Sequence, residues 1–377
     1  MYCPWMTDET RLFQKVVRQF VENEFVPHQQ RWHEQGQPDK EAWTKAGSLG
    51  MLLPDVPAEY GGGGGTFAYE AIVVQELARA GLHLGFGIQS IVAHYILAFG
   101  DEEQKRRWLP RLARGELIAA IGMTEPASGS DLQSIRTTAR RVGDNYFVDG
   151  AKTFITNGAS AGLLCLAVRT NRKEGPMALS LLLVETQELS GYRAGRSLRK
   201  IGRHAQQACE LFFAGVQVPS KNLLGSSEGR GLFQMMDQLP YERLSIALSA
   251  VVAAELAVEI TTRYAKERKA FGSSLFDLQN TRFILAECRT EAQIGRVFID
   301  QSIQQFIRNE LDPVASAMAK YWLTDTEFRI LDRCVQLYGG YGYMEESPIA
   351  RMWLDSRAQR IYAGSNETMK EVIGWSL

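Results

Sequence analysis

The sequence predicts an α+β protein with three consecutive domains, and three observations indicate their order. The first third shows helical apolar periodicity. Residues 120 to about 225 form short alternating runs separated by Gly, Asn and Pro, and from residue 229 onward apolar residues again recur at helical spacing. We therefore expect an N-terminal helical domain at 1–119, a β-barrel or sandwich-like domain at 120–228 and a C-terminal four-helix bundle at 229–377.

The N-terminal third contains several amphipathic segments. In residues 8–26 the apolar side chains fall on one stripe, and Pro27 ends the segment. Helical patterns resume from Phe67 to about Leu112, with a break at 81–87. Five consecutive glycines lie at 61–65. Because no GK[ST] follows them, we expect a flexible surface connector there and not a phosphate-binding loop.

The middle third has the residue pattern of strands and turns, whereas the last third has apolar residues at helical spacing. Gly143-Asp144-Asn145 and Asp149-Gly150 are typical turn residues between strands. Beyond residue 229, apolar residues recur every four positions and three further helical stretches follow; the repeating residues are Leu244, Leu248, Val252, Leu256 and Ile260. Nothing resembles a βαβ unit, and no GxGxxG follows a strand, so a nicotinamide-binding Rossmann site is not expected.

Composition excludes several classes of function. The 377 residues have a formal net charge of −1 without a basic block, which argues against nucleic acid as a partner. No apolar run approaches the roughly 18 residues of a membrane helix, and the N-terminus lacks the features of a signal peptide. Five scattered cysteines without a CxxC indicate reduced thiols, and we expect a cytoplasmic protein. The five histidines show no metal-ligand spacing, and no HExxH motif is present.

Four loops have residue types that suit a phosphate-containing ligand: IGMTEPASGSD (121–131), FITNG (154–158), ERKAFG (267–272) and QLYGGYGY (336–343). Each also has an ordinary explanation. TEPASGSD can be a plain turn, GGYGY a helix C-cap, and Arg268 a solvated surface charge. A fifth loop, RIYAGSNE (360–367), has small, hydroxyl and amide residues but carries Ala363 where a reactive side chain would be useful.

Taken together, the loops resemble the signatures of the acyl-CoA dehydrogenase family. MTEPASGSD is similar to its first signature, and QLYGGYGYMEESPIARMWLDSRAQRIYAGSNE is similar to its second; the resemblance extends from about residue 8 to the end of the chain. It implies FAD as cofactor, an acyl-CoA substrate, a homotetramer and an electron-transfer flavoprotein as partner. It implies no metal.

The resemblance also implies which residues bind FAD. Those expected at the flavin ring are Ile121, Gly122, Met123, Thr124, Ser130, Phe154, Ile155 and Thr156. Those expected at the pyrophosphate and adenosine, partly from a neighbouring subunit, are Arg268, Phe271, Gln279, Gln336, Leu337, Gly339 and Gly340; Ser365 and Glu367 complete the set. Arginine suits such a site because its planar guanidinium pairs with phosphate oxygens.

The position of the catalytic glutamate, which acts as the base, differs within the family. Many relatives carry it where this chain has Ala363. Long-chain and isovaleryl members place it instead on a C-terminal-domain helix, in a segment resembling LPYERLSIA. Glu242 matches that position and is the expected base; otherwise it would only complement a helix N-terminus beside Pro240. Ala363 keeps its backbone N–H, which the family uses to hold the thioester oxygen.

The remaining substrate-contacting residues implied by the resemblance are Ser130, Tyr241, Arg243 and Gly364. Arg243 has two interpretations: a partner of Glu242 or the substrate, or a charge on the helix surface. The expected function is FAD-dependent introduction of an α,β double bond into an acyl-CoA thioester. The alternatives are a flavin monooxygenase or an acyl-CoA oxidase of the same fold.

Overall fold

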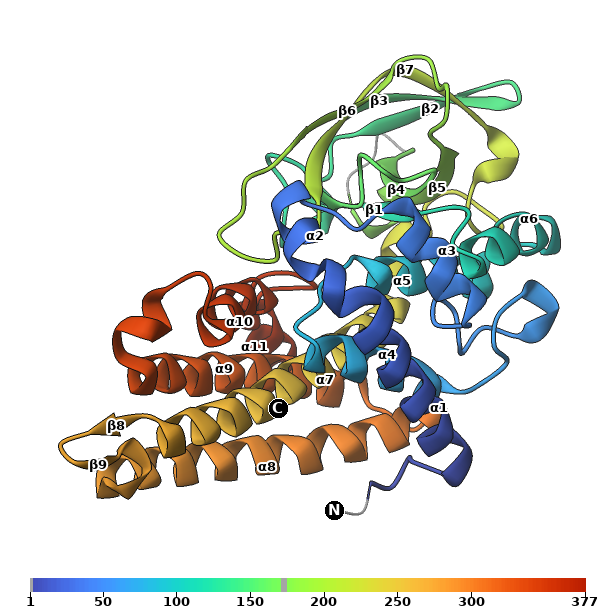
Figure 1. Ribbon diagram of the computed structural model, residues 1–377. Helices are drawn as coiled ribbons and strands as arrows, with labels where there is room; N and C mark the ends of the chain where they lie inside the picture. The colour runs from blue at the N-terminus through green and yellow to red at the C-terminus, as the bar shows by residue number, and fades with distance from the viewer. Residues whose placement is uncertain (1–2, 171–174) are drawn as a thin grey trace.

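The computed structural model describes residues 3–170 and 175–377, and it has the predicted order of helices, sheet and helices. Figure 1 shows the sheet at one end, the long C-terminal helices at the other, and the N-terminal helices packed against both. The first two residues of the predicted N-terminal domain, and 171–174 of the predicted middle domain, lie outside the described residues.

Six α-helices make up most of the first part of the chain: α1 (Asp8–Phe20), α2 (Gln29–Gln35), α3 (Lys40–Ser48), α4 (Phe67–Arg79), α5 (Phe86–Phe99) and α6 (Glu102–Ala113). The break expected at 81–87 is the connection between α4 and α5. Thr7 and Asp101 begin α1 and α6 with reciprocal capping boxes, so local side-chain chemistry determines where these helices start.

The glycine run at 61–65 is not the flexible connector that its composition suggested. Its N–H groups bond back onto the preceding segment, with Gly63 N donating to Leu53 O (3.0 Å) and Gly64 N to Val56 O (2.8 Å). A Cβ atom at Gly62 would lie 2.2 Å from the oxygen of Val56. The run is glycine-rich because two stretches of backbone touch, and its committed N–H groups leave no phosphate cradle.

One curled seven-stranded sheet forms the middle part, as Figure 1 shows. Its strands are β1 (Ala119–Gly122), β2 (Thr138–Val142), β3 (Asn145–Thr156), β4 (Leu163–Arg169), β5 (Leu179–Glu185), β6 (Tyr192–Ser197) and β7 (Ala208–Pro219). They lie in the order β1-β4-β2-β3-β7-β6, with β5 paired to β4 and β1 parallel to β4. The predicted turn at Gly143 joins β2 to β3. The turn predicted at Asp149-Gly150 is wrong: this dipeptide lies inside β3 at a register shift, where Gly150 packs against Thr137.

Strand β4 is buried on both faces and explains why LLCLAV is a continuous apolar run. Leu163 and Cys165 contribute to the core beneath the N-terminal helices, whereas Leu164 and Leu166 contribute to the core inside the curled sheet. Alternate residues therefore serve two cores, as the period of two requires.

Three long helices dominate the C-terminal part: α7 (Gly231–Glu267), α8 (Gln279–Ile307) and α9 (Pro313–Tyr338). The shorter α10 (Pro348–Ser356) and α11 (Asn366–Gly374) pack against α9, and a small hairpin of β8 (Lys269–Ala270) and β9 (Ser273–Ser274) joins α7 to α8. By length and composition α7 could cross a membrane, which the sequence expectation missed. More than half of its most apolar stretch is buried within the fold, as in the central helix of a bundle.

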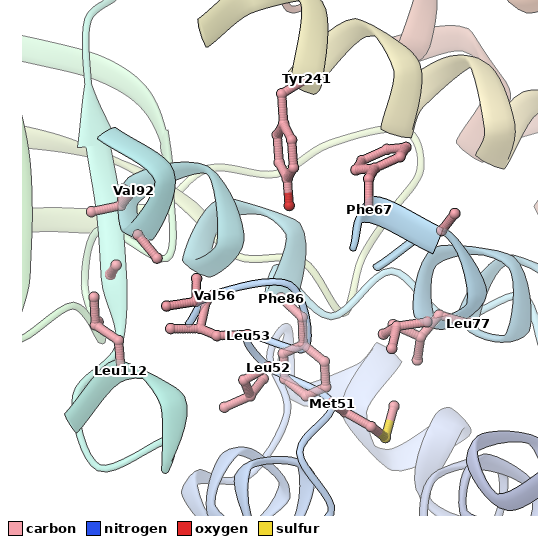
Figure 2. Packing of buried hydrophobic residues seen from close by; sticks show 14 of the residues in the cluster. Met51, Leu52, Leu53, Val56, Phe67, Leu77, Phe86, Val92, Leu112 and Tyr241 are labelled. Atoms are coloured by element: carbon pink, nitrogen blue, oxygen red, sulfur yellow. The ribbon is translucent and has the colours of Figure 1, made fainter. Parts of the chain in front are cut away.

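The largest core continues from the N-terminal helices into α7. Figure 2 shows Met51, Leu53 and Phe86 meeting beneath Tyr241, whose ring comes from α7. Phe67 lies 5.3 Å from Tyr241, ring centre to ring centre. Because one apolar cluster includes residues of all three predicted domains, their relative placement depends on shared burial.

A buried ion pair anchors the loop that follows β1. Lys152 Nζ lies 2.8 Å from Glu125 Oε1 and donates to Met123 O (3.0 Å), and both side chains are almost completely inaccessible to solvent. Glu125 also accepts the backbone N–H groups of Arg136 (2.7 Å) and Thr137 (2.9 Å). Burial lowers the pKa of Lys152 to about 8, against the opposing charge of Glu125. Both charges are satisfied, so the loop backbone is held in one position.

We predict that Lys152→Met will lower the free energy of unfolding by about 3–5 kcal/mol, because it leaves the Glu125 carboxyl buried without its cation. Urea unfolding at neutral pH measures this. The matched control is Lys221→Met, which removes a solvent-exposed pair with Glu103 and should change stability far less. Equal losses in the two variants would contradict the structural role of the buried pair.

Candidate active site

The carboxyl group of Glu242 lies buried where α7 packs against α5. It is 9% exposed, and Tyr95 Oη lies 3.2 Å from Glu242 Oε1, within hydrogen-bonding distance. Burial raises the pKa of Glu242 to about 7, although Tyr95 and Arg243 favour the ionised form. The alternative that Glu242 complements a helix N-terminus is wrong, because α7 begins at Gly231 and Pro240 lies inside it. A carboxyl group with such a pKa can accept a proton near neutral pH.

Arg243 follows Glu242 and is buried as well, at 4% exposure, so its interpretation as a helix-surface charge is wrong. Its Nε atom has no hydrogen-bond partner within the described part of the chain. Burial lowers the pKa of Arg243, while the adjacent Glu242 raises it. A buried guanidinium with free donors can orient an acceptor group of a ligand.

The turn at 363–366 has an unusual backbone that a buried lysine supports. Ala363 and Gly364 both have positive φ, 53° and 84°. Lys320 Nζ, fully buried on α9, donates to Gly364 O (2.7 Å) and to Asn366 Oδ1 (3.0 Å). Burial, with a contribution from the nearby charge of Arg243, lowers the pKa of Lys320 to about 8. Lys320 therefore fixes this turn to α9, which packs along α7.

Two residues of the turn have defined local roles. Ser365 is the N-cap of α11, where its hydroxyl accepts the Thr368 N–H (3.3 Å). Asn366 is buried and donates to Thr324 Oγ1 (3.0 Å) and Asp325 Oδ1 (2.9 Å). These bonds set the direction in which the backbone at Ala363 points. Glu367 lies in the first turn of α11 and is exposed.

The residues expected at a flavin ring come together at the edge of the sheet. Ile121 and Gly122 end β1, and Met123 and Thr124 follow directly. Thr153 N donates to Thr124 O (3.0 Å). This bond brings the end of β3, residues 154–156, alongside the loop after β1. Phe154 is 69% exposed with φ 60°, whereas Ile155 is buried. An exposed aromatic ring held at positive φ by its neighbours offers a surface for a flat ligand. Ser130 lies in the exposed part of the same loop.

The residues expected at the pyrophosphate and adenosine lie at the hairpin that joins α7 to α8 and at the end of α9. The Arg268 guanidinium lies 5.6 Å from the Tyr341 ring centre, which joins the ERKAFG loop to the segment of Gln336, Leu337, Gly339 and Gly340. Gln279 begins α8, and Phe271 at the tip of the hairpin is 95% exposed. Within the described residues Arg268 forms no ion pair. Figure 1 shows this hairpin far from the sheet, so one chain does not bring the two sets together.

Sequence reasoning missed three residues that support these loops: Tyr95, Lys152 and Lys320. Lys320 had a usable signal, since it is a single charge in the apolar stretch ASAMAKYWL, where a buried partner is the simplest explanation. Tyr95 had none, because nothing in the sequence pairs it with a residue about 150 positions away. Among residues 3–170 and 175–377 no group of His, Cys, Asp or Glu is arranged to hold a metal ion.

Comparison with known proteins identifies the family. Models of the N-terminal, middle and C-terminal domains of acyl-CoA dehydrogenase match residues 7–116, 120–216 and 229–377. The chain is 42% identical to the long-chain specific acyl-CoA dehydrogenase, mitochondrial, of Sus scrofa, over 97% of this chain and 86% of that protein. An acyl-CoA dehydrogenase structure from Geobacillus kaustophilus has a TM-score of 0.97 at 42% identity, covering 100% of this chain and 99% of the other.

A glutaryl-CoA dehydrogenase from Mycobacterium smegmatis, solved in complex with FADH2, has a TM-score of 0.92 at 27% identity, covering 100% and 98% of the two chains. The helix–sheet–helix fold is that of the acyl-CoA dehydrogenase class of oxidoreductases. The chain belongs to the acyl-CoA dehydrogenase family. Family membership confirms the predicted fold, the enzyme class and the general reaction, and it implies a flavin cofactor.

We predict that the Glu242 carboxyl titrates near pH 7 and that Tyr95→Phe raises this midpoint. The phenol donates to the ionised carboxylate, so its removal favours the protonated form. A hydrogen bond to the ionised carboxylate is worth about 0.5–1.5 kcal/mol more than one to the neutral carboxyl group, which corresponds to a rise of roughly half to one pH unit. Infrared difference titration against Glu242→Gln measures the midpoint. Tyr69→Phe, which removes a phenol bonded to the distant Glu9, is the control and should leave it unchanged. A lower midpoint in Tyr95→Phe would contradict the assigned bond.

Proposed function

We propose that this protein is an FAD-dependent acyl-CoA dehydrogenase in which Glu242 removes the α-proton of the acyl thioester. The observation that carries the proposal is the buried Glu242 carboxyl group, with its raised pKa, in a chain that has Ala363 in the turn where many relatives carry their acid. The general class follows from the family. The base, the particular flavin and the assembly are the parts proposed here.

The residues present fit FAD in two places. Phe154, with the backbone of Met123 and Thr124, offers a flat surface with fixed polar groups for a flavin ring. The unpaired guanidinium of Arg268 beside Tyr341 offers a cation and an aromatic face for the pyrophosphate and adenine. When bound, the oxidised flavin supplies the acceptor for the hydride that leaves the β-carbon.

Glu242 can act as the base because burial destabilises its ionised form and so raises its pKa. A carboxylate in water is a poor base for a carbon acid, and withdrawing it from solvent raises its proton affinity toward the useful range. Tyr95 keeps the carboxyl in position through its hydroxyl. Proton removal and departure of the β-hydride leave the electron pair of the α-C–H bond as the new double bond.

The turn at Ala363 binds the thioester oxygen, on which negative charge develops as the α-proton leaves. The backbone N–H of Ala363 donates to that oxygen, and a donor held in place before the reaction stabilises the developing charge best. Lys320 and Asn366 hold the turn. The buried cation of Arg243 adds favourable potential beside Glu242 and orients the thioester end of the substrate, together with Gly364 and Ser130. Tyr241 contacts a more distant part of the substrate.

We also propose a homotetramer in which the Arg268 set of one chain completes the flavin site of another. Many large apolar side chains of the C-terminal helices and their loops are exposed, as a further interface requires: Phe271, Leu278, Phe283, Ile294, Val297, Met318, Tyr341 and Tyr343. The proposed electron acceptor is an electron-transfer flavoprotein. The free cysteines support a reducing compartment, and we propose the cytoplasm.

The test of the function is anaerobic titration of the flavin-loaded enzyme with a panel of acyl-CoA thioesters, with loss of flavin absorbance as the signal. We predict that Glu242→Gln slows flavin reduction by about 10²- to 10⁴-fold, because glutamine keeps the shape but cannot accept the proton. FAD content should be unchanged, since the flavin contacts lie in other loops.

The control for this variant is Ala363→Gly, which retains the N–H. At φ 53° glycine adopts the backbone more easily than alanine, so we expect reduction within a few-fold of the wild-type rate. Reduction of Glu242→Gln at the wild-type rate would show that another group is the base.

A separate prediction links cofactor binding to assembly. Arg268→Met should lower FAD occupancy, and removing FAD should weaken the oligomer, because a ligand shared between chains stabilises the assembly that binds it. Sedimentation with parallel flavin quantification measures both. Arg263→Met is the control, since Arg263 lies in the last turns of α7, shortly before Arg268, but pairs with Glu259 of its own chain. A stable FAD-loaded monomer would overturn the shared site.

A further inference from the structure

A buried polar cluster adjoins Glu242 and has no role in the proposed reaction. It consists of Asp55, Glu70 near the start of α4, Ser90 and His94 on α5, and Tyr241 on α7. His94 Nε2 lies 3.3 Å from Asp55 Oδ2, and the His94 ring stacks on Tyr241 with centres 4.1 Å apart. Tyr241 is 4% and Glu70 3% exposed, and the Asp55 side chain is 5% exposed. The cluster is therefore enclosed by three helices and the 51–57 segment.

Three oxygen atoms of this cluster form no hydrogen bond of normal geometry in the described chain: Asp55 Oδ1, Glu70 Oε2 and Tyr241 Oη. Their polar neighbours include one another and Ser90, which interacts weakly with Glu70 and Tyr241. The three atoms belong to three different segments. Figure 2 shows the Tyr241 hydroxyl pointing away from α7, between α5 and Phe67. Buried polar atoms without partners are uncommon in folded proteins and costly to retain. Their convergence indicates a place for a small polar group.

The cluster adjoins the reacting end through two helix contacts. On α5, Tyr95 faces Glu242 and its neighbour His94 faces Tyr241; on α7, Glu242 and Tyr241 are likewise neighbours. Consecutive helical residues are about 1.5 Å apart along the axis but about 100° apart around it, so Tyr241 and Glu242 leave α7 in different directions. Both nevertheless contact α5, which places the two contacts at one interface between α5 and α7. An acyl chain that starts at Glu242 and follows this interface meets the cluster.

The charges of the cluster select a neutral ligand group. Asp55 is already paired with His94, whose pKa is raised by Asp55 despite its burial. Burial and the charge of Asp55 raise the pKa of Glu70 to about 8, so Glu70 is mainly protonated at neutral pH. The cluster then has no net charge but holds free acceptors and a phenol donor. A hydroxyl group, which both donates and accepts, satisfies it. A carboxylate would meet the oxygens of Asp55 and Glu70.

We propose that Asp55, Glu70 and Tyr241 bind a hydroxyl group on the distal part of the acyl chain, so that the enzyme's preferred substrates are hydroxylated acyl-CoA thioesters. This proposal rests on the proposed function. It assigns the cluster to substrate selection and leaves proton removal to Glu242.

The test compares pairs of acyl-CoA thioesters of equal length, one ending in a methyl group and one in a hydroxyl group, across a series of chain lengths. Anaerobic stopped-flow reduction of the flavin-loaded enzyme gives the rate at low substrate concentration. At one chain length we expect the hydroxylated thioester to react at least about tenfold faster than its methyl-terminated partner, because otherwise the buried oxygens stay unpaired. The thioester ending in a carboxylate should react more slowly than both.

Glu70→Met removes one of the free oxygens with little change in volume and should abolish the preference. Glu76→Met is the matched control: Glu76 is equally buried on α4 but is bonded to Arg18 (2.8 Å) and Gln14 (2.7 Å). We expect the control to lose stability and keep the preference. Glu70→Met should not lose stability, because folding at neutral pH no longer has to protonate a carboxyl group.

If the wild-type enzyme shows no preference for the hydroxylated thioester at any chain length, that result by itself overturns the proposal. So does a preference that persists in Glu70→Met, since the cluster would then be a structural polar network. Failure of the proposed function has a different signature, because then no thioester of either kind would reduce the flavin.

Discussion

The burial of one carboxyl group at the seam between α5 and α7 is the constraint on which the site depends. The proposed role of Glu242 as base requires a carboxyl group far enough from water to bind a proton near neutral pH, yet held so that it faces one atom of a substrate. Tyr95 supplies the position, and the surrounding core supplies the low polarity. The same core brings the N-terminal helices against α7, so the packing that stabilises the fold also sets the pKa of the proposed base.

Two buried lysines extend this arrangement to the ligand loops. Lys152 donates to the carbonyl of Met123 and Lys320 to that of Gly364, and burial lowers the pKa of each to about 8. In both cases an ammonium group inside the protein holds a loop by its backbone. A loop held through its carbonyl groups can present N–H groups and exposed rings to a ligand without reorganising, which is what electrostatic stabilisation of a developing charge requires.

Several features were predictable from local sequence because local physics produces them. The capped helices, the hairpin at Gly143 and the apolar period of β4 follow from side-chain chemistry within a few residues. The errors arose where distant backbone intervenes. The glycines at 61–65 looked flexible in isolation but pack against the preceding turn, and Asp149-Gly150 looked like a turn but lies at a bulge where Thr137 approaches.

The sequence by itself determined the fold class, the family and the identity of the candidate base, because the signature loops and the pairing of Ala363 with Glu242 are written in residue types and order. Tertiary structure alone decided the environment of that base. The partnership of Glu242 with Tyr95, the buried state of Arg243, the lysine beneath the 363–366 turn and the unpaired oxygens around Tyr241 all join segments far apart in the chain. Their energies depend on exclusion of water, which packing produces and no single segment specifies.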